Sequence, residues 1–247
     1  MRPAVPQREM VLQTEGNKAM ILAAGLGTRL GELTKSRPKA LVRWDGVPIL
    51  EMVILKLIKY GFNEIVINVH HFAEMVMEFV SRKNNYGIRI EFSHEKEALL
   101  DTGGGIAKAS WFFGPEPVLI YNVDINSNID LRKLYRAHLE GGRIATLAVK
   151  ERVTSRSLLM DDRGILKGWR DNRTGETILA GGEQGHLVPI AFSGIQVINP
   201  EIVQLFPEKE QFPIMPFFLE LARTREIQLY RHDRDTWIDM GKLENYS

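Results

Sequence analysis

The chain has 247 residues, and its 32 Lys and Arg residues nearly balance its 31 Asp and Glu residues, for a formal charge of +1. This balance argues against a nucleic-acid partner, because proteins that hold a polyanion concentrate basic residues on one face. Cysteine is absent, which excludes disulfide scaffolds, thiolate metal sites and cysteine nucleophiles, and leaves oxygen and imidazole as metal ligands.

Residues 1–17 are polar, contain prolines and show no sustained hydrophobic period, which predicts a tail outside the fold. They lack the apolar stretch of a secretory signal, and no apolar run in the chain approaches the roughly 20 residues of a membrane helix. We therefore expect a cytoplasmic protein with no membrane partner. Residues 18–247 are predicted to form a single domain, since their number lies near the upper limit for one hydrophobic core.

The first predicted element is a strand over residues 19–24, a continuous apolar run that ends at Gly25 and is typical of a strand buried on both faces. A long loop follows as far as Lys39. Pro48 then opens a helix whose apolar residues recur at the spacing of one helix face as far as Ile58. A buried strand followed by such a helix indicates the crossover of a parallel sheet.

The same alternation continues to about residue 150 and then loosens into shorter strand-like pieces and glycine turns. It predicts a doubly wound α/β sheet, in which ligands bind beyond the carboxyl ends of the strands. Gly25 and Asp124 both occupy such ends. Further strands are predicted at 64–69, 88–92, 118–123, 144–149 and 192–198, and a further helix at 73–80.

Residues 25–31 form a glycine-rich loop directly after the first strand. The loop fails the dinucleotide fingerprint because Leu30 stands where the third glycine belongs, which argues against a dehydrogenase. No Gly-Lys-Ser/Thr sequence follows at the spacing of a Walker loop, so kinase and ATPase interpretations weaken as well. Bare backbone amides beside two cations, Arg29 and Lys39, are suited to holding a triphosphate.

Two stretches of the chain carry a family resemblance. Residues 22–30, followed by Pro38-Lys39-Ala40-Leu41, resemble the opening signature of the sugar-1-phosphate nucleotidyltransferases. Residues 101–106 and 68–71 are similar to motifs of the branch that transfers a uridylyl group to N-acetylmuramate 1-phosphate. The resemblance implies a Rossmann-like, three-layer α/β/α fold with a mixed, mostly parallel sheet. It also implies a nucleotide-binding half, about 18–150, and a sugar-phosphate-binding half, about 151–247.

The same resemblance implies the site residues. Asp124 matches the first metal-binding aspartate of the family, and Asp239 matches the aspartate that supplies the second ligand. Mg²⁺ is the implied cofactor, since it binds oxygen and often takes one or two carboxylates beside phosphates and water. The expected catalytic residues are Arg29, Lys39 and Asp124. The expected nucleotide-binding residues are Ala23, Ala24, Gly25, Leu26, Gly27, Thr28, Arg29, Lys39, Thr102, Gly103 and Gly104.

Several positions depart from the family pattern. Ala40 stands where a second proline is usual, Val123 stands where a glycine usually precedes the aspartate, and Lys242-Leu243 replaces Thr-Pro. None of these changes removes a proposed charged ligand. The family's Glu-Lys-Pro motif for the sugar phosphate is not evident. Arg170, near the expected place of that motif, and Gly194 are taken as the sugar-phosphate ligands.

Two other groups of residues invite a functional interpretation that the sequence does not favour. His70 and His71 point in different directions in an extended chain, and no further spaced histidine completes a metal site. We expect them to be loop or helix-entry residues near the cleft. The aromatic residues at 111–113 and 217–218 are expected in the core rather than stacked on a base.

The expected reaction is an attack by a sugar phosphate oxygen on the α-phosphorus of a nucleoside triphosphate, with pyrophosphate as the leaving group. The expected substrates are UTP and N-acetylmuramate 1-phosphate, or a related amino sugar of cell-wall recycling. Guanylyl transfer to mannose 1-phosphate, cytidylyl transfer to phosphocholine and a non-catalytic nucleotide-sugar sensor stay open as alternatives. The sequence says nothing of the oligomeric state.

Overall fold

The computed structural model describes residues 17–182 and 185–242. The predicted tail lies outside this range except for Asn17, which begins the first strand, β1 (Asn17–Leu22). β1 pairs in parallel with β4 (Phe62–Val69) on one side and β6 (Val118–Asn122) on the other. Because both edges of β1 are paired and both faces are covered, Ala19, Met20 and Ile21 are fully buried.

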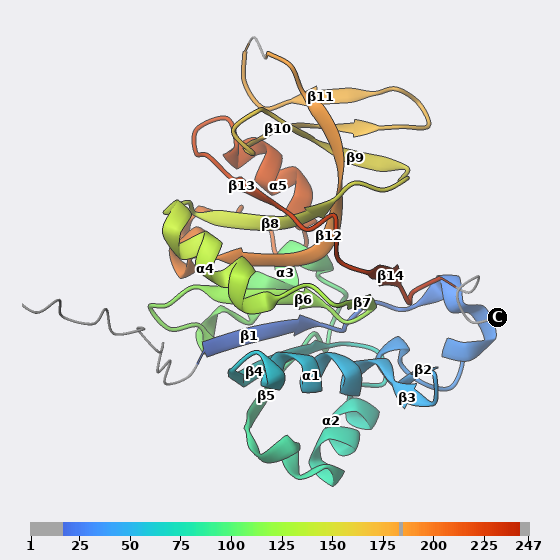
Figure 1. The fold of residues 1–247 in the computed structure, drawn as a ribbon. Helices are drawn as coiled ribbons and strands as arrows, with labels where there is room; N and C mark the ends of the chain where they lie inside the picture. The colour runs from blue at the N-terminus through green and yellow to red at the C-terminus, as the bar shows by residue number, and fades with distance from the viewer. Residues whose placement is uncertain (1–16, 183–184, 243–247) are drawn as a thin grey trace, which may run out of the picture.

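The order of the strands explains which loops meet. The other strands of the ten-stranded sheet are β5 (Arg89–His94), β8 (Ala145–Lys150), β9 (Arg156–Met160), β10 (Leu166–Asp171), β11 (Thr177–Leu179), β12 (Val188–Ile198) and β13 (Gln228–Arg231). The sheet runs β11-β10-β9-β12-β6-β1-β4-β5, with β8 paired to β12 and β13 paired to β8 (Figure 1). Since β12 is antiparallel to both β6 and β8, β8 points the same way as β6, and β13 is parallel to β8. The carboxyl ends of β1, β4, β6, β8 and β13 therefore share one edge.

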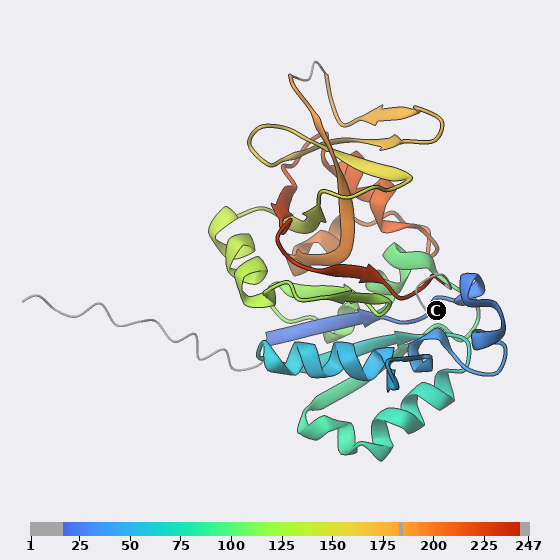
Figure 2. The ribbon, with the colours of Figure 1, turned by 45° about the vertical axis from the view of Figure 1, so that its right-hand side comes forward.

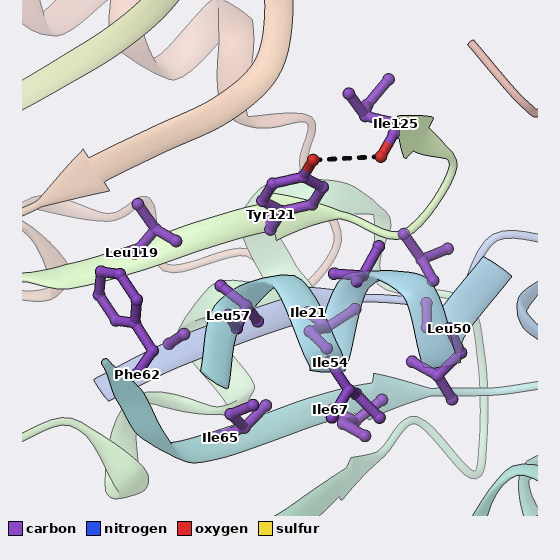
Figure 3. Packing of buried hydrophobic residues seen from close by; sticks show 14 of the residues in the cluster. Ile21, Leu50, Ile54, Leu57, Phe62, Ile65, Ile67, Leu119, Tyr121 and Ile125 are labelled. Atoms are coloured by element: carbon purple, nitrogen blue, oxygen red, sulfur yellow. Dashed lines mark hydrogen bonds between the residues drawn. The ribbon is translucent and has the colours of Figure 1, made fainter. Parts of the chain in front are cut away.

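Helices cover both faces of this sheet. They are α1 (Ile49–Lys59), α2 (Ala73–Arg82), α3 (Asp101–Lys108), α4 (Leu131–Gly141) and α5 (Ile214–Leu221). The first, second and fourth share a core with Ile21 of β1, whereas α3 and α5 share a second core with Met20 of the same strand. Figure 3 shows the first core, where Ile54 and Leu57 of α1 face the sheet. The three-layer fold with a mixed, mostly parallel sheet is confirmed.

The predicted strands and helices are present, with their ends shifted by a few residues, while the helices α3, α4 and α5 were not predicted. The aromatic prediction is correct for Phe112 and Phe218, which are buried. It is wrong for Trp111, whose residue surface is 58% exposed. Phe217 is partly buried against the second core.

β12 connects the two halves of the chain within one sheet. Its second part pairs with β6 and β8, and its first part pairs with β9. The register against β8 shifts between Phe192 and Gln196, and Gly194 within this stretch has a φ of 73°. The strand bends here, so that β9, β10 and β11 form an antiparallel wing beyond the main sheet (Figure 1).

A small antiparallel sheet of two strands lies at the shared edge. Its strands are β7 (Ile125–Ser127), which follows β6, and β14 (Trp237–Asp239), which follows β13 (Figure 2). The remaining elements are the hairpin β2 (Arg43–Trp44) and β3 (Val47–Pro48) and 3-10 turns at Thr28–Thr34, Lys39–Leu41, Asn84–Gly87, Ser110–Phe112 and Pro200–Leu205. Across the described ranges, no helix combines the length and apolarity needed to cross a membrane.

Candidate active site

The loop after β1 is folded around the side chain of Lys39. Gly27 has a φ of 68°, and a Cβ at this position would lie 2.9 Å from Lys39 Cβ and 2.9 Å from Thr34 Cγ2. The Thr34 hydroxyl donates to the Gly27 carbonyl at 3.1 Å and fixes the turn. A side chain at position 27 would strain the backbone and displace Lys39. Glycine is thus required both by the dihedral angle and by the close approach.

The other predicted residues of this loop occupy distinct places. Ala23 and Ala24 are buried at the carboxyl end of β1, and the Ala23 amide donates to the Asn68 carbonyl at 3.1 Å. Leu26 is exposed. Thr28 begins the 3-10 turn that carries Arg29.

Two cations meet two carboxylates beside this loop. Lys39 Nζ lies 2.6 Å from Asp124 Oδ2, and the Lys39 side chain is only 12% exposed. The Arg29 guanidinium, which is 59% exposed, lies 3.4 Å from Asp239 Oδ2 and 3.9 Å from Asp124 Oδ2. Lys39 is therefore held in place by its surroundings, whereas Arg29 has room to reorient.

Asp124 and Asp239 converge because β14 pairs with β7. Asp239 lies opposite Ile125, and the Met240 amide donates to the Asp124 carbonyl at 2.7 Å. The Gly241 amide donates to Asp239 Oδ1 at 2.8 Å. A Cβ at Gly241 would lie 2.7 Å from Asp124 Oδ2 and 2.9 Å from Asp239 Oδ1, so the lack of a side chain keeps the space between the two carboxylates open.

This pair of carboxylates fits a hard divalent cation. Carboxylate oxygens are the ligands that Mg²⁺ prefers, and it commonly binds through one or two of them together with phosphates and water. In residues 17–182 and 185–242, no three His, Cys, Asp or Glu side chains are clustered so as to hold a metal by themselves. The pair formed by Asp124 and Asp239 would thus need oxygen ligands from a substrate to complete a site.

A cavity of about 270 Å³ lies beside the carboxylates, beyond the carboxyl ends of β1, β4 and β6. Its predicted lining residues are Ala24, Gly25, Lys39, Thr102 and Asp124. Its lining also includes residues that were not expected as site residues: Leu22, Asn68 and Asp101, which lie within the family motifs, and Leu99 and Asn122, which lie outside them. The cavity is therefore polar at the strand ends and placed where the fold predicts a ligand.

Glu95, which was not expected as a site residue, supports one wall of this cavity. The carboxylate is 1% exposed and accepts hydrogen bonds from Asn68 Nδ2 at 2.6 Å and from the Leu100 amide at 2.7 Å. A Cβ at Gly105 would lie 2.8 Å from Glu95 Oε1. The glycine in α3 thus makes room for the carboxylate that orients Asn68 at the cavity wall.

The three residues predicted at the base and ribose differ in their surroundings. Thr102 lines the cavity, and its hydroxyl accepts from the Ile214 amide at 2.9 Å. The amides of Gly103 and Gly104 both donate to the Phe212 carbonyl, and a side chain at Gly103 would overlap the Phe212 ring. Both glycines thus pack α3 against the segment before α5.

The two predicted sugar-phosphate ligands lie in different places. Gly194 is next to the cavity wall, since a Cβ there would lie 3.0 Å from Asn122 Nδ2. Arg170 lies exposed on β10 in the wing and does not line the cavity. His70 lies between β4 and α2, with its Nδ1 2.6 Å from the Glu95 carbonyl oxygen, and the His71 ring contacts the Phe72 ring at a tilt of 47°.

The chain matches a model of a known protein family. A family model described as nucleotidyl transferase matches residues 18–157. The matched range contains the glycine loop, Lys39 and Asp124. Asp239 lies beyond it and is brought to the site by the fold.

Named relatives match nearly the whole chain. The chain is 31% identical over 214 residues to the N-acetylmuramate alpha-1-phosphate uridylyltransferase of Caulobacter vibrioides, covering 83% of this chain and 84% of that protein. It is 26% identical to the UTP–glucose-1-phosphate uridylyltransferase of Synechocystis sp. and 28% identical to the catalytic subunit beta of mannose-1-phosphate guanylyltransferase of Drosophila pseudoobscura. These two matches cover 93% and 94% of this chain, but the chain spans only 61% of the length of each relative.

A solved structure shares the fold. The structure of HddC from Yersinia pseudotuberculosis, complexed with GMP-PN, matches with a TM-score of 0.75 at 22% sequence identity. The match covers 93% of this chain and 96% of that one. The architecture is therefore shared over the length of both chains.

Proposed function

Since the chain belongs to the nucleotidyl transferase family, we propose that it transfers a nucleotidyl group from a nucleoside triphosphate to a sugar 1-phosphate and releases pyrophosphate. The observation that carries the proposal is the convergence of Asp124 and Asp239 beside Lys39, at the edge of the cavity that follows β1. Carboxylates, a held ammonium and a glycine loop are the groups that phosphoryl chemistry requires.

In the proposed reaction, an oxygen of the acceptor phosphate attacks the α-phosphorus of the triphosphate. The bond from the α-phosphorus to the oxygen that bridges to the β-phosphate breaks, and pyrophosphate leaves with that electron pair. Two anions must approach each other, so positive charge that is already in position lowers the barrier. Lys39 supplies such a charge because its side chain is held by Asp124, and the exposed Arg29 is free to close over the phosphates.

Asp124 and Asp239 are proposed to hold Mg²⁺, whose other ligands are phosphate oxygens and water. When bound, Mg²⁺ neutralises phosphate charge and polarises the phosphorus–oxygen bonds. The chain's own contribution is to fix the two carboxylates at either side of Gly241, through the pairing of β7 with β14.

The proposed substrates are UTP and N-acetylmuramate 1-phosphate. The relative that carries this activity in its name is 31% identical and is covered over 84% of its length. A guanylyl transfer to mannose 1-phosphate is the second candidate, favoured by the 28% identity to a mannose-1-phosphate guanylyltransferase subunit. Both candidates use the same groups around Asp124, and they differ in the base and the sugar that the cavity selects.

The test is pyrophosphate release by the purified protein with Mg²⁺. UTP, GTP, CTP and dTTP are each combined with N-acetylmuramate, glucose and mannose 1-phosphates and with phosphocholine. We expect release that requires UTP and N-acetylmuramate 1-phosphate together and that EDTA abolishes. Asp124→Asn should lower the rate by about 10²- to 10³-fold, the loss seen for groups that stabilise transition-state charge. Asp162→Asn, in an exposed turn, serves as the matched control.

Other outcomes of this assay would change the proposed substrates, the reaction or the site. Release with GTP and mannose 1-phosphate would keep the reaction class and replace the substrates. Nucleotide binding without release in any combination would overturn the reaction and favour a nucleotide-sugar sensor. Release at an unchanged rate in the Asp124→Asn variant would show that the chemistry takes place elsewhere.

A further inference from the structure

The sheet brings an arginine to the site from the second half of the chain. β8 ends at Lys150 and runs parallel to β6, so the chain leaves it at the edge where Asp124 follows β6. Arg152 is in this exit segment. β13, parallel to β8, leads at the same edge into β14, which carries Trp237 and Asp239. Arg152 is therefore placed by topology beside the strand that supplies the second carboxylate.

The Arg152 side chain is held in a fixed position. Its guanidinium carbon lies 3.7 Å from the centroid of the Trp237 ring, and one terminal nitrogen donates to the Phe192 carbonyl at 2.8 Å. Trp237 is held in turn, because its indole nitrogen donates to the Ser193 carbonyl at 2.9 Å. A guanidinium stacked on an aromatic ring and tied to backbone loses little freedom when it binds an anion.

Among the described residues, no carboxylate is paired with the charge of Arg152. Its nitrogens form no ion pair with a carboxylate of the described ranges, and its buried Nε has no hydrogen-bond partner there. Burial lowers the pKa of the guanidinium, while the charge of Asp239 raises it, so Asp239 is the carboxylate whose field reaches this group. A half-buried cation without a paired anion is costly unless a ligand supplies one.

We infer that Arg152 binds the phosphate group of the acceptor, with Trp237 as the residue that positions it. The inference rests on the proposed function and adds the acceptor ligand that the sequence did not identify. Arg29 and Lys39 follow β1 and contact Asp124, and Lys39 also lines the cavity. Arg152 comes from the second half of the chain and lies against Trp237, on the strand that also carries Asp239. Positive charge is thus brought to the two carboxylates by both halves of the chain, which suits a reaction in which two phosphate groups must meet.

The kinetic test compares Arg152→Ala and Arg152→Lys with Arg170→Ala. Arg152→Ala should raise KM for the acceptor about 10- to 100-fold, the usual loss for a hydrogen bond to a charged group, and leave KM for the triphosphate unchanged. Arg152→Lys should recover part of the loss, and free guanidinium ions should rescue Arg152→Ala but not Arg152→Lys. Arg170→Ala should leave both KM values unchanged, and Arg163→Ala, in an exposed turn of the wing, is the matched control.

A binding test works without turnover. Inorganic phosphate is titrated against the wild type while tryptophan fluorescence is followed, and Trp237→Phe identifies the signal among the four tryptophans of the chain. We expect a saturable change in fluorescence that Arg152→Ala abolishes. Nucleotide binding, which also shows that the variant is folded, should be kept.

If the wild type releases no pyrophosphate with any substrate pair, the proposed function fails, and the phosphate titration still decides the inference. An unchanged acceptor KM or an unchanged phosphate titration in Arg152→Ala would overturn the inference. A rise confined to the triphosphate KM would overturn it too and assign Arg152 to the nucleotide.

Discussion

The ammonium of Lys39 lies 2.6 Å from Asp124 Oδ2, although 85 positions separate the two residues. Lys39 comes from the end of the glycine loop and Asp124 from the end of β6, two neighbours of the same sheet edge. The glycine at position 27 lets the loop close over the Lys39 side chain. The contact therefore shows that the glycine loop and the Asp124 carboxylate form one structural unit.

Replacing Lys39 by Met should lower kcat by about 10²- to 10³-fold, because the charge in place for the triphosphate is lost. The measurement is pyrophosphate release under saturating substrates. Lys35→Met is the matched control, since Lys35 lies near the same loop but is exposed and paired with Glu32. A Lys39→Met variant as fast as the control would remove Lys39 from the catalytic residues.

Replacing Gly241 by Ala should raise the Mg²⁺ concentration that the reaction needs without lowering the stability of the fold. The new Cβ would enter the space 2.7 Å from Asp124 Oδ2 and 2.9 Å from Asp239 Oδ1, so the two carboxylates could no longer share a cation. We expect the Mg²⁺ concentration at half-maximal rate to rise at least tenfold while the unfolding temperature changes little. Gly182→Ala, where a Cβ meets open space, is the control. An unchanged Mg²⁺ dependence would argue against a metal between these residues.

Replacing Glu95 by Ala should destabilise the protein. Asn68 Nδ2 and the Leu100 amide would lose their buried acceptor, at a cost of about 1–3 kcal/mol each in the free energy of unfolding. Thermal unfolding should therefore occur several degrees lower, and KM for the triphosphate should rise because Asn68 lines the cavity. Glu97→Ala, at an exposed position of the same segment, should match the wild type. A variant with wild-type unfolding temperature would contradict the supporting role of Glu95.

His232 should make the protein sensitive to acid. It is 4% exposed, its Nε2 lies 2.7 Å from the Ser193 hydroxyl, and burial lowers its pKa from 6.5 to about 4, against the raising effect of Asp235. Between pH 6.5 and 4 the unfolded chain takes up the proton first, so the free energy of unfolding falls as the pH falls, by about 3 kcal/mol in all. Urea unfolding across this range should show a smaller fall in His232→Gln. The control, His186→Gln, replaces an exposed histidine. Equal slopes in wild type and His232→Gln would refute the assignment.

The side chains of Ser193, His232 and Asp235 contact one another in the serine–histidine–aspartate arrangement of a hydrolytic triad. His232 Nδ1 lies 3.5 Å from Asp235 Oδ2. Ser193 has no exposed surface, so its hydroxyl cannot reach a substrate. The chain of contacts fixes the segment before Gly194 instead, and the Ser193 carbonyl holds Trp237. Its role is therefore structural.

The fold of the first half could be predicted because its signals are local. The apolar run of β1 and the spacing of apolar residues in α1 each lie within one stretch of sequence. α5 escaped prediction because its eight residues are apolar on nearly every side and include Pro216, so they show no helical period. Its burial in the second core, not its pattern, makes it a helix.

The site could be predicted only in part. The family resemblance identified Asp124 and Asp239, but their meeting depends on the pairing of β7 with β14, which no local pattern encodes. Gly103 and Gly104 matched a nucleotide motif, yet their amides are bonded to the Phe212 carbonyl. No sequence pattern distinguishes Arg152 from other arginines in polar loops. Only the fold shows that it lies beside Trp237.

Arg29 and Asp239 are 210 positions apart, so the chain must close a very long loop before these side chains meet. β1 and β4 pair residues far closer in sequence, such as Ala19 with Ile65, so the unit of β1, α1 and β4 is expected to form first in folding and the more distant strand pairings later. During refolding, helical content and apolar burial should therefore return before substrate turnover does. A kinetic lag between these signals would mark the moment at which β14 joins β7.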